Sequence, residues 1–248
     1  MKKGHDFIFE VCANGLTSLL RAQKAGTTRV ELCEAIEVGG LTPSYGCLKL
    51  AAAQKTIPVN VLIRCRAGHY VYSDLEKSQM LEDIKLVKSL GFEGIVVGAL
   101  LEDGSIDVGF LQEVKNLAFG LHLTFHRAID AAYDPIESLT KLVALGFNTV
   151  LTSGSQPTAM QGVELIRKMQ EVCGNKINIM AGGGINAQNA KFIVQQTGIK
   201  TLHFSAKTKM QLKTVFPAGV DVTQADMTYS ATDVELVKAT IESVLDYE

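Results

Sequence analysis

The chain has 248 residues, of which 47% are hydrophobic and 20% are charged. Its 24 lysine and arginine residues nearly balance its 26 aspartate and glutamate residues, which leaves a net charge of −2. This balance excludes nucleic-acid binding by bulk positive charge, and the apolar content excludes a disordered acidic chain.

Short apolar segments alternate with helix-length amphipathic stretches along the chain. Strands are predicted at 7–12, 29–33, 59–64, 94–98, 122–126, 149–152, 177–181 and 201–205. Several of the helices between them are predicted to end in a left-handed glycine, at Gly26, Gly91, Gly146 and Gly198. Eight strand–helix units in this length are typical of an α/β protein of the (β/α)8 or TIM-barrel type. A doubly wound open sheet is the alternative, but it usually has fewer strands.

No linker, charge block or low-complexity tract divides the chain, so we expect one TIM-barrel domain over residues 1–248. Its core is expected at about 7–207. The C-terminal tail, 208–248, is polar and includes one amphipathic helix predicted at about 233–245. That helix either closes the barrel or packs on a neighbouring subunit.

Polar side chains gather where the predicted strands end, and active sites of such barrels lie at this end. Residues two apart on a strand face the same side, which pairs Glu10 with Cys12, Glu31 with Cys33, Arg64 with Arg66, Thr124 with His126, and His203 with Ser205. Two interpretations remain open for the carboxylates. They either form buried ion pairs with Arg64, Arg66 or Arg127 that only stabilise the barrel, or remain available for proton transfer and ligand binding. His126 and His203 are similarly either core residues or functional groups.

Cys12 and Cys33 end adjacent predicted strands. Neighbouring strands lie roughly 4.8 Å apart, so the two sulfurs are able to converge. A pair of thiolates suits a soft ion such as Cu(I). On the residues alone, two small buried side chains in a crowded corner are the favoured interpretation, because there is no Cys-x-x-Cys spacing.

The glycine run Gly182, Gly183 and Gly184 follows the seventh predicted strand. Barrels often bind phosphate with the loops after strands seven and eight, where glycines let backbone N–H groups approach an anion closely. His203 and Ser205 come from the eighth strand and complete such a site. The alternative is a tight turn that needs glycine for its backbone alone.

Several segments together resemble the CutC copper-homeostasis family, from about Phe7 to Lys207. They are Val-Glu-Leu-Cys at 30–33, Gly-Gly-Leu-Thr-Pro-Ser at 39–44, Ile-Arg-Cys-Arg-Ala-Gly at 63–68, Thr-Phe-His-Arg-Ala-Ile-Asp at 124–130, Leu-Thr-Ser-Gly at 151–154 and Met-Ala-Gly-Gly-Gly at 180–184. The resemblance implies a cytoplasmic barrel that forms homodimers or higher homo-oligomers. It also implies copper handling, with Cu(I) bound by two cysteines that match Cys12 and Cys33. Cys65 departs from the pattern, which often has proline there, and adds a third thiol nearby.

Two functions are therefore expected as alternatives. The first is copper homeostasis through Cu(I) binding at Cys12 and Cys33. The second is an enzyme of the lyase or isomerase type that acts on a small anionic or phosphorylated substrate. Its acid/base candidates are Glu10, Glu31 and His126. Its anion-binding candidates are Arg64, Arg66, Arg127, Gly182, Gly183, Gly184, His203 and Ser205.

The sequence also predicts the cellular location of the protein and the absence of contacts with membranes and nucleic acid. The first residues lead into a short apolar stretch that contains Glu10, which is not the pattern of a signal peptide. Five cysteines without close pairing are typical of reduced thiols. No apolar run approaches the roughly 18 residues of a membrane span. We expect a cytoplasmic protein that contacts neither membranes nor nucleic acid.

Overall fold

The computed structural model describes residues 7–211, 219 and 227–245. Eight parallel strands form a closed barrel in chain order: β1 (Ile8–Asn14), β2 (Arg29–Cys33), β3 (Val59–Leu62), β4 (Gly94–Val97), β5 (His122–Phe125), β6 (Thr149–Thr152), β7 (Asn178–Gly182) and β8 (Thr201–Phe204). The barrel closes because β1 pairs with both β2 and β8. The predicted (β/α)8 fold and its eight strands are thereby confirmed.

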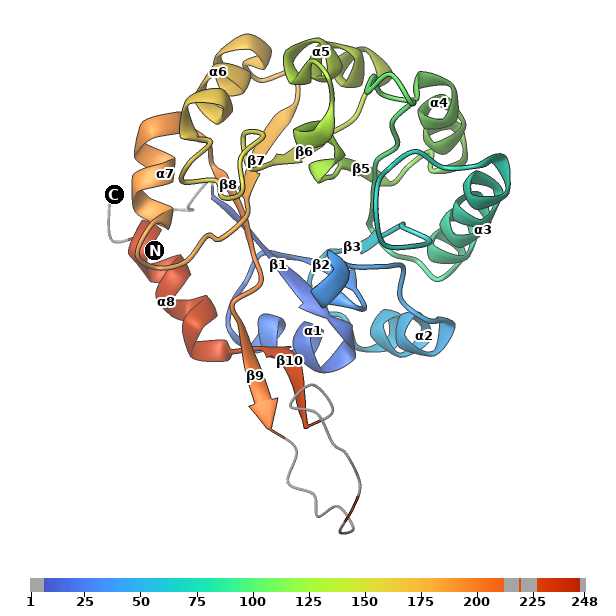
Figure 1. Cartoon of the computed structure of the whole chain (residues 1–248). Helices are drawn as coiled ribbons and strands as arrows, with labels where there is room; N and C mark the ends of the chain where they lie inside the picture. The colour runs from blue at the N-terminus through green and yellow to red at the C-terminus, as the bar shows by residue number, and fades with distance from the viewer. Residues whose placement is uncertain (1–6, 212–218, 220–226, 246–248) are drawn as a thin grey trace.

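A ring of helices surrounds the barrel, as Figure 1 shows. The helices are α1 (Gly15–Lys24), α2 (Tyr45–Gln54), α3 (Asp74–Ser89), α4 (Val108–Leu117), α5 (Pro135–Leu145), α6 (Val163–Cys173), α7 (Ala190–Thr197) and α8 (Val234–Leu245). Two short 3-10 helices, η1 (Ile36–Val38) and η2 (Arg127–Ala131), follow β2 and β5. Within the described segments, no helix has the length and apolar character needed to cross a membrane.

Local sequence signals account for the helix boundaries. Ser73 and Glu76 form a capping box at the start of α3, each side chain accepting from the backbone of the other. Asp134 accepts from two N–H groups at the start of α5, where a proline occupies the first turn. Gly146 ends α5 with a φ of 79°, a conformation that costs other residues energy. The prediction of left-handed glycine ends is therefore confirmed.

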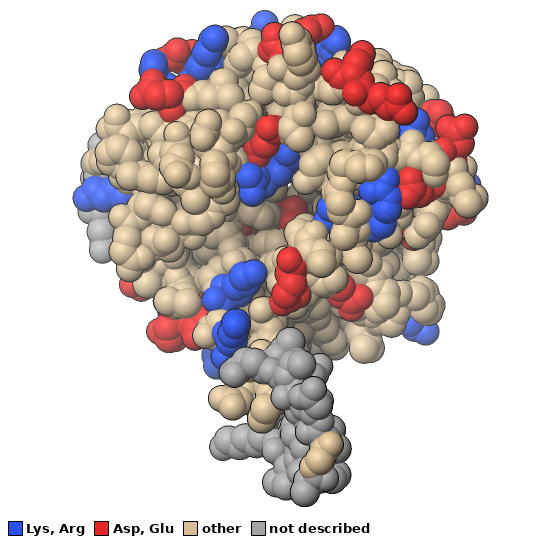
Figure 2. Space-filling view, in the orientation of Figure 1, with Lys and Arg blue, Asp and Glu red and all other residues tan. Residues whose placement is uncertain are grey.

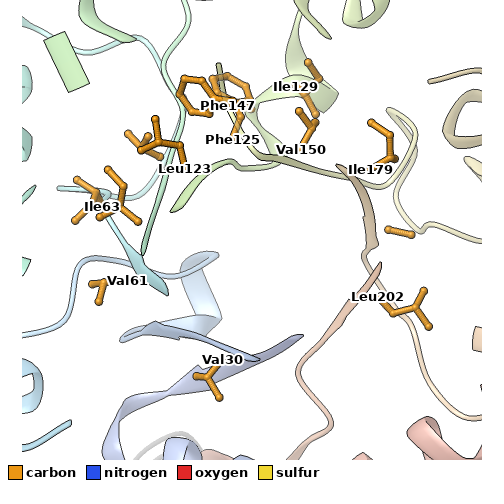
Figure 3. Close-up of a cluster of buried hydrophobic side chains, with 14 of the residues drawn as sticks. Val30, Val61, Ile63, Leu123, Phe125, Ile129, Phe147, Val150, Ile179 and Leu202 are labelled. Carbon is orange, nitrogen blue, oxygen red and sulfur yellow. The ribbon is translucent and has the colours of Figure 1, made fainter. Parts of the chain in front are cut away.

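The two faces of the barrel strands differ in chemistry. Outward-facing side chains are apolar and pack beneath the helices, and Figure 3 shows part of this layer, including Val30, Val61, Phe125, Val150 and Leu202. The inward face is largely polar and internally hydrogen-bonded. Asn178 Nδ2 donates to Thr201 Oγ1 at 2.7 Å, and His122 Nε2 lies 3.0 Å from Thr149 Oγ1. The hydrophobic core is thus the layer between strands and helices, and polar groups occupy the barrel axis.

The C-terminal segment, predicted as a polar tail with one helix, also contains two strands. β9 (Lys207–Gln211) and β10 (Thr228–Thr232) pair as an antiparallel two-stranded sheet that projects from the barrel in Figure 1. These strands are short and polar, so their sequence carries no clear strand pattern. The predicted helix is confirmed as α8, which packs between α7 and α1 and closes the ring. The rest of the predicted tail, 212–218, 220–226 and 246–248, lies outside the described residues.

Candidate functional site

A cavity of about 570 Å³ opens at the carboxyl ends of the barrel strands. Figure 2 shows the hollow near the middle of the molecule, with acidic and basic side chains around it. Most of the residues proposed from the sequence line it: Cys12, Glu31, Arg64, His126, Arg127, Gly183, Gly184, His203 and Ser205. Glu10, Cys33 and Gly182 are buried in the barrel and are absent from its lining.

The two thiols lie side by side at the ends of β1 and β2. Cys12 Sγ is 3.7 Å from Cys33 Sγ and 3.3 Å from Glu31 Oε1. Cys12 reaches the cavity, whereas Cys33 is fully buried against Leu62 and Val96. The hydrogen bond with Cys33, together with burial, raises the pKa of the Cys12 thiol well above its ordinary value. The Cys12 side chain is therefore a protonated thiol at neutral pH.

Beneath the thiols, four side chains of alternating charge lie in contact across the barrel: Arg29, Glu10, His203 and Glu31. Glu10 is fully buried, forms an ion pair with Arg29 through Oε2, and lies 2.9 Å from His203 Nδ1 through Oε1. Burial acts to raise the pKa of Glu10, but the charges of Arg29 and His203 outweigh it and hold the pKa at about 2. Burial likewise opposes charge on His203, yet Glu31 and the hydrogen bonds of Cys12 and Glu10 raise its pKa well above the ordinary value. Glu10 is thus ionised and His203 protonated.

Glu31 completes this chain of charges. Its Oε1 lies 3.9 Å from His203 Nε2, and its buried Oε2 has no hydrogen-bond partner among the described residues. Burial raises the pKa of Glu31, against the opposing effect of His203. The expected ion-pair partners of the carboxylates were Arg64, Arg66 or Arg127. The structure instead pairs Glu10 with Arg29, which stands opposite it in the β1–β2 register.

Arg64 and His126 form another wall of the cavity. Arg64 follows β3 and donates to the carbonyls of Val38 and Gly40, both at 2.9 Å, and to that of Gly68 at 2.8 Å. His126 follows β5, and its Nδ1 accepts from the Ala128 N–H at 3.1 Å. Burial, aided by the charge of Arg64, lowers the pKa of His126 to about 3, so the ring is neutral.

Arg127 also lines the cavity, and its charge is paired with that of Asp130. Its Nε donates to Asp130 at 2.8 Å, and its Nη2 donates to Ser153 Oγ at 2.6 Å. Asp130 was not singled out from the sequence, although it belongs to the segment 124–130 that carries the family resemblance. The nearby glycines need their backbone freedom, since φ is 104° at Gly183 and 75° at Gly184. The loop after β7 is therefore a tight turn that also lines the cavity.

The structure places Arg66 away from the cavity. Its guanidinium forms an ion pair with Glu76 of α3 and donates to backbone carbonyls of its own loop, including that of Val71 at 2.7 Å. The predicted strand ran to Arg64, but β3 ends at Leu62, so the two-residue alternation does not extend to Arg66. Cys65 is partly buried and does not line the cavity.

Two groups of side chains have metal-ligand geometry among the described residues. One comprises Cys12, Glu31 and Cys33, and the other comprises Glu10, Glu31 and His203. Within each group the possible ligand atoms all lie within 4.8 Å of one another. The second group already has an internal cation in protonated His203, whereas the first offers two sulfurs and one oxygen. The first is the better candidate for a soft metal ion.

Fold and site together define a (β/α)8 barrel with a paired-thiol and acid–base site at its mouth. Comparison with known proteins identifies the family: residues 7–208 match the CutC family, and the chain belongs to it. A CutC family protein of Pasteurella multocida is 47% identical over 198 residues, covering 80% of this chain and 81% of that protein. A CutC family protein of Photobacterium profundum is 40% identical over 239 residues, covering 95% and 98%.

A solved structure supports the same assignment. The crystal structure of CutC from Streptococcus agalactiae, which its name connects with copper homeostasis, superposes with a TM-score of 0.76 at 40% identity. The match covers 80% of this chain and 98% of that one. The barrel and the family expected from the sequence are thereby confirmed.

Proposed function

We propose that the protein serves copper homeostasis by binding Cu(I) through Cys12 and Cys33. The observation that carries this proposal is the separation of 3.7 Å between the two sulfurs. Zinc–thiolate bonds are about 2.3 Å long, and with bonds of that length one ion bridges sulfurs up to about 4.6 Å apart. The thiol pair therefore fits a single ion without rearrangement of β1 or β2.

The surroundings of the pair suit an exchangeable cargo ion. Cys12 lines the cavity, so an ion has a path from solvent to the sulfurs. Thiolates are soft ligands that favour Cu(I) over harder ions, and both thiols lose their protons when they bind it. Glu31 Oε1 accepts the Cys12 hydrogen bond, which makes this oxygen the nearest acceptor for the Cys12 proton.

Copper uptake by the reduced protein tests the proposal. We expect the wild-type chain to bind Cu(I) in competition with a chromophoric chelator, and Cys12→Ser or Cys33→Ser to abolish that binding, because a hydroxyl is a poor ligand for a soft ion. Cys65→Ser is the matched control, since its thiol lies outside the cavity lining, and it should bind like the wild type. Unchanged stoichiometry in the double variant Cys12→Ser/Cys33→Ser contradicts the proposal.

A second candidate function is an enzyme with acid/base chemistry of the lyase or isomerase type. The cavity favours it, because carboxylate and imidazole groups with shifted pKa values meet there, as in the active sites of enzymes. Glu31 and His126 line the cavity, whereas Glu10 is buried beneath it and would act through His203. Conversion of a small anionic or phosphorylated substrate by Cys12→Ser/Cys33→Ser would show that the enzymatic function does not depend on copper binding.

We also infer a homodimer or higher homo-oligomer in the cytoplasm. The two-stranded sheet β9–β10 supports assembly, because only its base packs on α1 and β1 while the rest projects from the barrel and is open to contact with a second copy. Light scattering on the purified chain is expected to give a mass at least twice that of one chain. A monomeric mass contradicts the inference.

A further inference from the structure

We propose that the cavity binds a small organic oxyanion, a carboxylate or a phosphate monoester, through Arg64 and His126. Neither residue belongs to the thiol pair, so the inference does not depend on copper binding. It deepens the second candidate function, because it names the chemical groups that hold its substrate.

Arg64 provides a buried positive charge that no carboxylate neutralises. The side chain lies at the cavity and is only 5% exposed, yet it forms no ion pair within the described part of the chain. Three backbone carbonyls accept from its terminal nitrogens, and its Nε–H has no acceptor among those residues. A buried cation without a counter-charge is costly, so an anion in the cavity would stabilise it.

His126 provides a second donor without a partner. Its Nδ1 accepts from the Ala128 N–H, so the neutral ring carries its proton on Nε2. That Nε2–H is buried, and no described residue accepts from it. The imidazole also sits tightly against Gly98, where an added Cβ would lie 2.4 Å from its Cε1. The ring is therefore held in place with one N–H donor that the described residues leave unused.

The Tyr70 ring lies against both Arg64 and His126. Its ring centroid lies 4.8 Å from that of His126 and 5.4 Å from Arg64 Cζ, so both side chains pack on one aromatic ring. All three residues line the same cavity. Two side chains, each with one N–H group that no described residue accepts from, thus border one cavity, and one of them carries an unmatched positive charge.

No acidic group of the described cavity lining pairs with Arg64 or His126. Asp130 accepts from Arg127, from Thr152 Oγ1 at 2.5 Å and from the backbone N–H of Ser153. Glu31 Oε1 lies 3.3 Å from Cys12 Sγ and 3.9 Å from His203 Nε2. The positive charge of Arg64 and the donor groups therefore favour a ligand that accepts hydrogen bonds and carries negative charge, as carboxylates and phosphates do.

Titration of simple anions tests this inference. Thermal unfolding of the reduced protein is followed in inorganic phosphate and, separately, in succinate, with sodium chloride at equal ionic strength as the reference. We expect a saturable rise in melting temperature from at least one of the two anions, because a ligand that binds only the folded state stabilises it. A rise in melting temperature with phosphate indicates recognition of a phosphate group, and a rise with succinate indicates recognition of a carboxylate.

Three variants locate the site. His126→Asn keeps an oxygen that can accept from the Ala128 N–H but removes the Nε2–H, and Arg64→Lys removes the Nε–H but keeps the charge. Each is expected to raise the dissociation constant of the anion at least tenfold. Arg66→Lys is the matched control and is expected to bind like the wild type, because its guanidinium lies outside the cavity.

Three results would overturn the inference. The first is the absence of any saturable stabilisation beyond chloride in the wild type, and the second is equal anion affinity in His126→Asn and the wild type. If Arg64→Lys fails to fold, the dissociation constant of the anion for His126→Asn tests the inference by itself. Anion binding that disappears in Cys12→Ser/Cys33→Ser would also overturn it by placing the ligand at the thiols. Measurement of Cu(I) binding by His126→Asn tests the copper proposal separately, because this variant keeps both thiols.

Discussion

Replacing Glu10 with glutamine is expected to lower the free energy of unfolding by about 3–5 kcal/mol, as removal of one partner from a buried ion pair does. The substitution keeps the size of the side chain, so its effect comes from charge. Glu10 is fully buried and contacts both Arg29 and His203. Without its carboxylate, two buried cations lose the anion that they share. Folded proteins are stable by only about 5–15 kcal/mol, so such a loss is readily measured by urea denaturation.

Two comparisons identify charge pairing as the cause. Glu137→Gln removes the exposed ion pair with Lys141 and should cost less than about 1 kcal/mol. The double variant Glu10→Gln/Arg29→Met removes both buried charges and should be less destabilised than the sum of its single changes. A cost for Glu10→Gln as small as that for Glu137→Gln would contradict the electrostatic account.

Acidification below pH 6.5 is expected to destabilise the fold, because buried His126 and partly buried His122 are held in the neutral form. Burial, with Arg29 nearby, lowers the pKa of His122 to about 4, and burial, with Arg64 nearby, lowers that of His126 to about 3. In the unfolded chain both protonate near pH 6.5. Between pH 6.5 and 4 the unfolded state therefore binds protons that the folded state does not. The stability that depends on these two neutral histidines is full above pH 6.5 and falls as the pH falls, by about 3 kcal/mol for each histidine at pH 4.

Variants separate the histidines from other titrating groups such as Glu31. His122→Gln retains a side-chain nitrogen that can donate to Thr149 Oγ1, the partner of His122 Nε2, but it cannot titrate. Urea denaturation at pH 7, 6 and 5 should show a shallower loss of stability in this variant than in the wild type. Equal pH dependence in the two proteins would show that His122 does not titrate as described.

The barrel could be predicted because its signals are local. Apolar segments such as Val30 to Cys33 and Gly94 to Val97 recur between amphipathic stretches, and glycines such as Gly146 mark helix ends. The positions of Cys12 and Cys33 at the ends of adjacent strands follow from chain order alone, since parallel strands of a barrel neighbour one another in sequence. The sheet β9–β10 was not anticipated, because its short polar strands resemble an irregular segment.

The charge partners within the barrel required the three-dimensional structure. Arg29 precedes Glu31 by two residues and shares its face, yet its contact with Glu10 depends on the register of β1 against β2. Arg64 and Arg66 both follow β3, but one enters the cavity and the other pairs with α3. Periodicity ends where a strand ends, so the direction of a loop side chain is set by tertiary packing. Strand order along the chain therefore determined the fold and the thiol pair. Register and loop conformation determined the ion pairs, and they left Arg64 Nε and His126 Nε2 without a partner among the described residues.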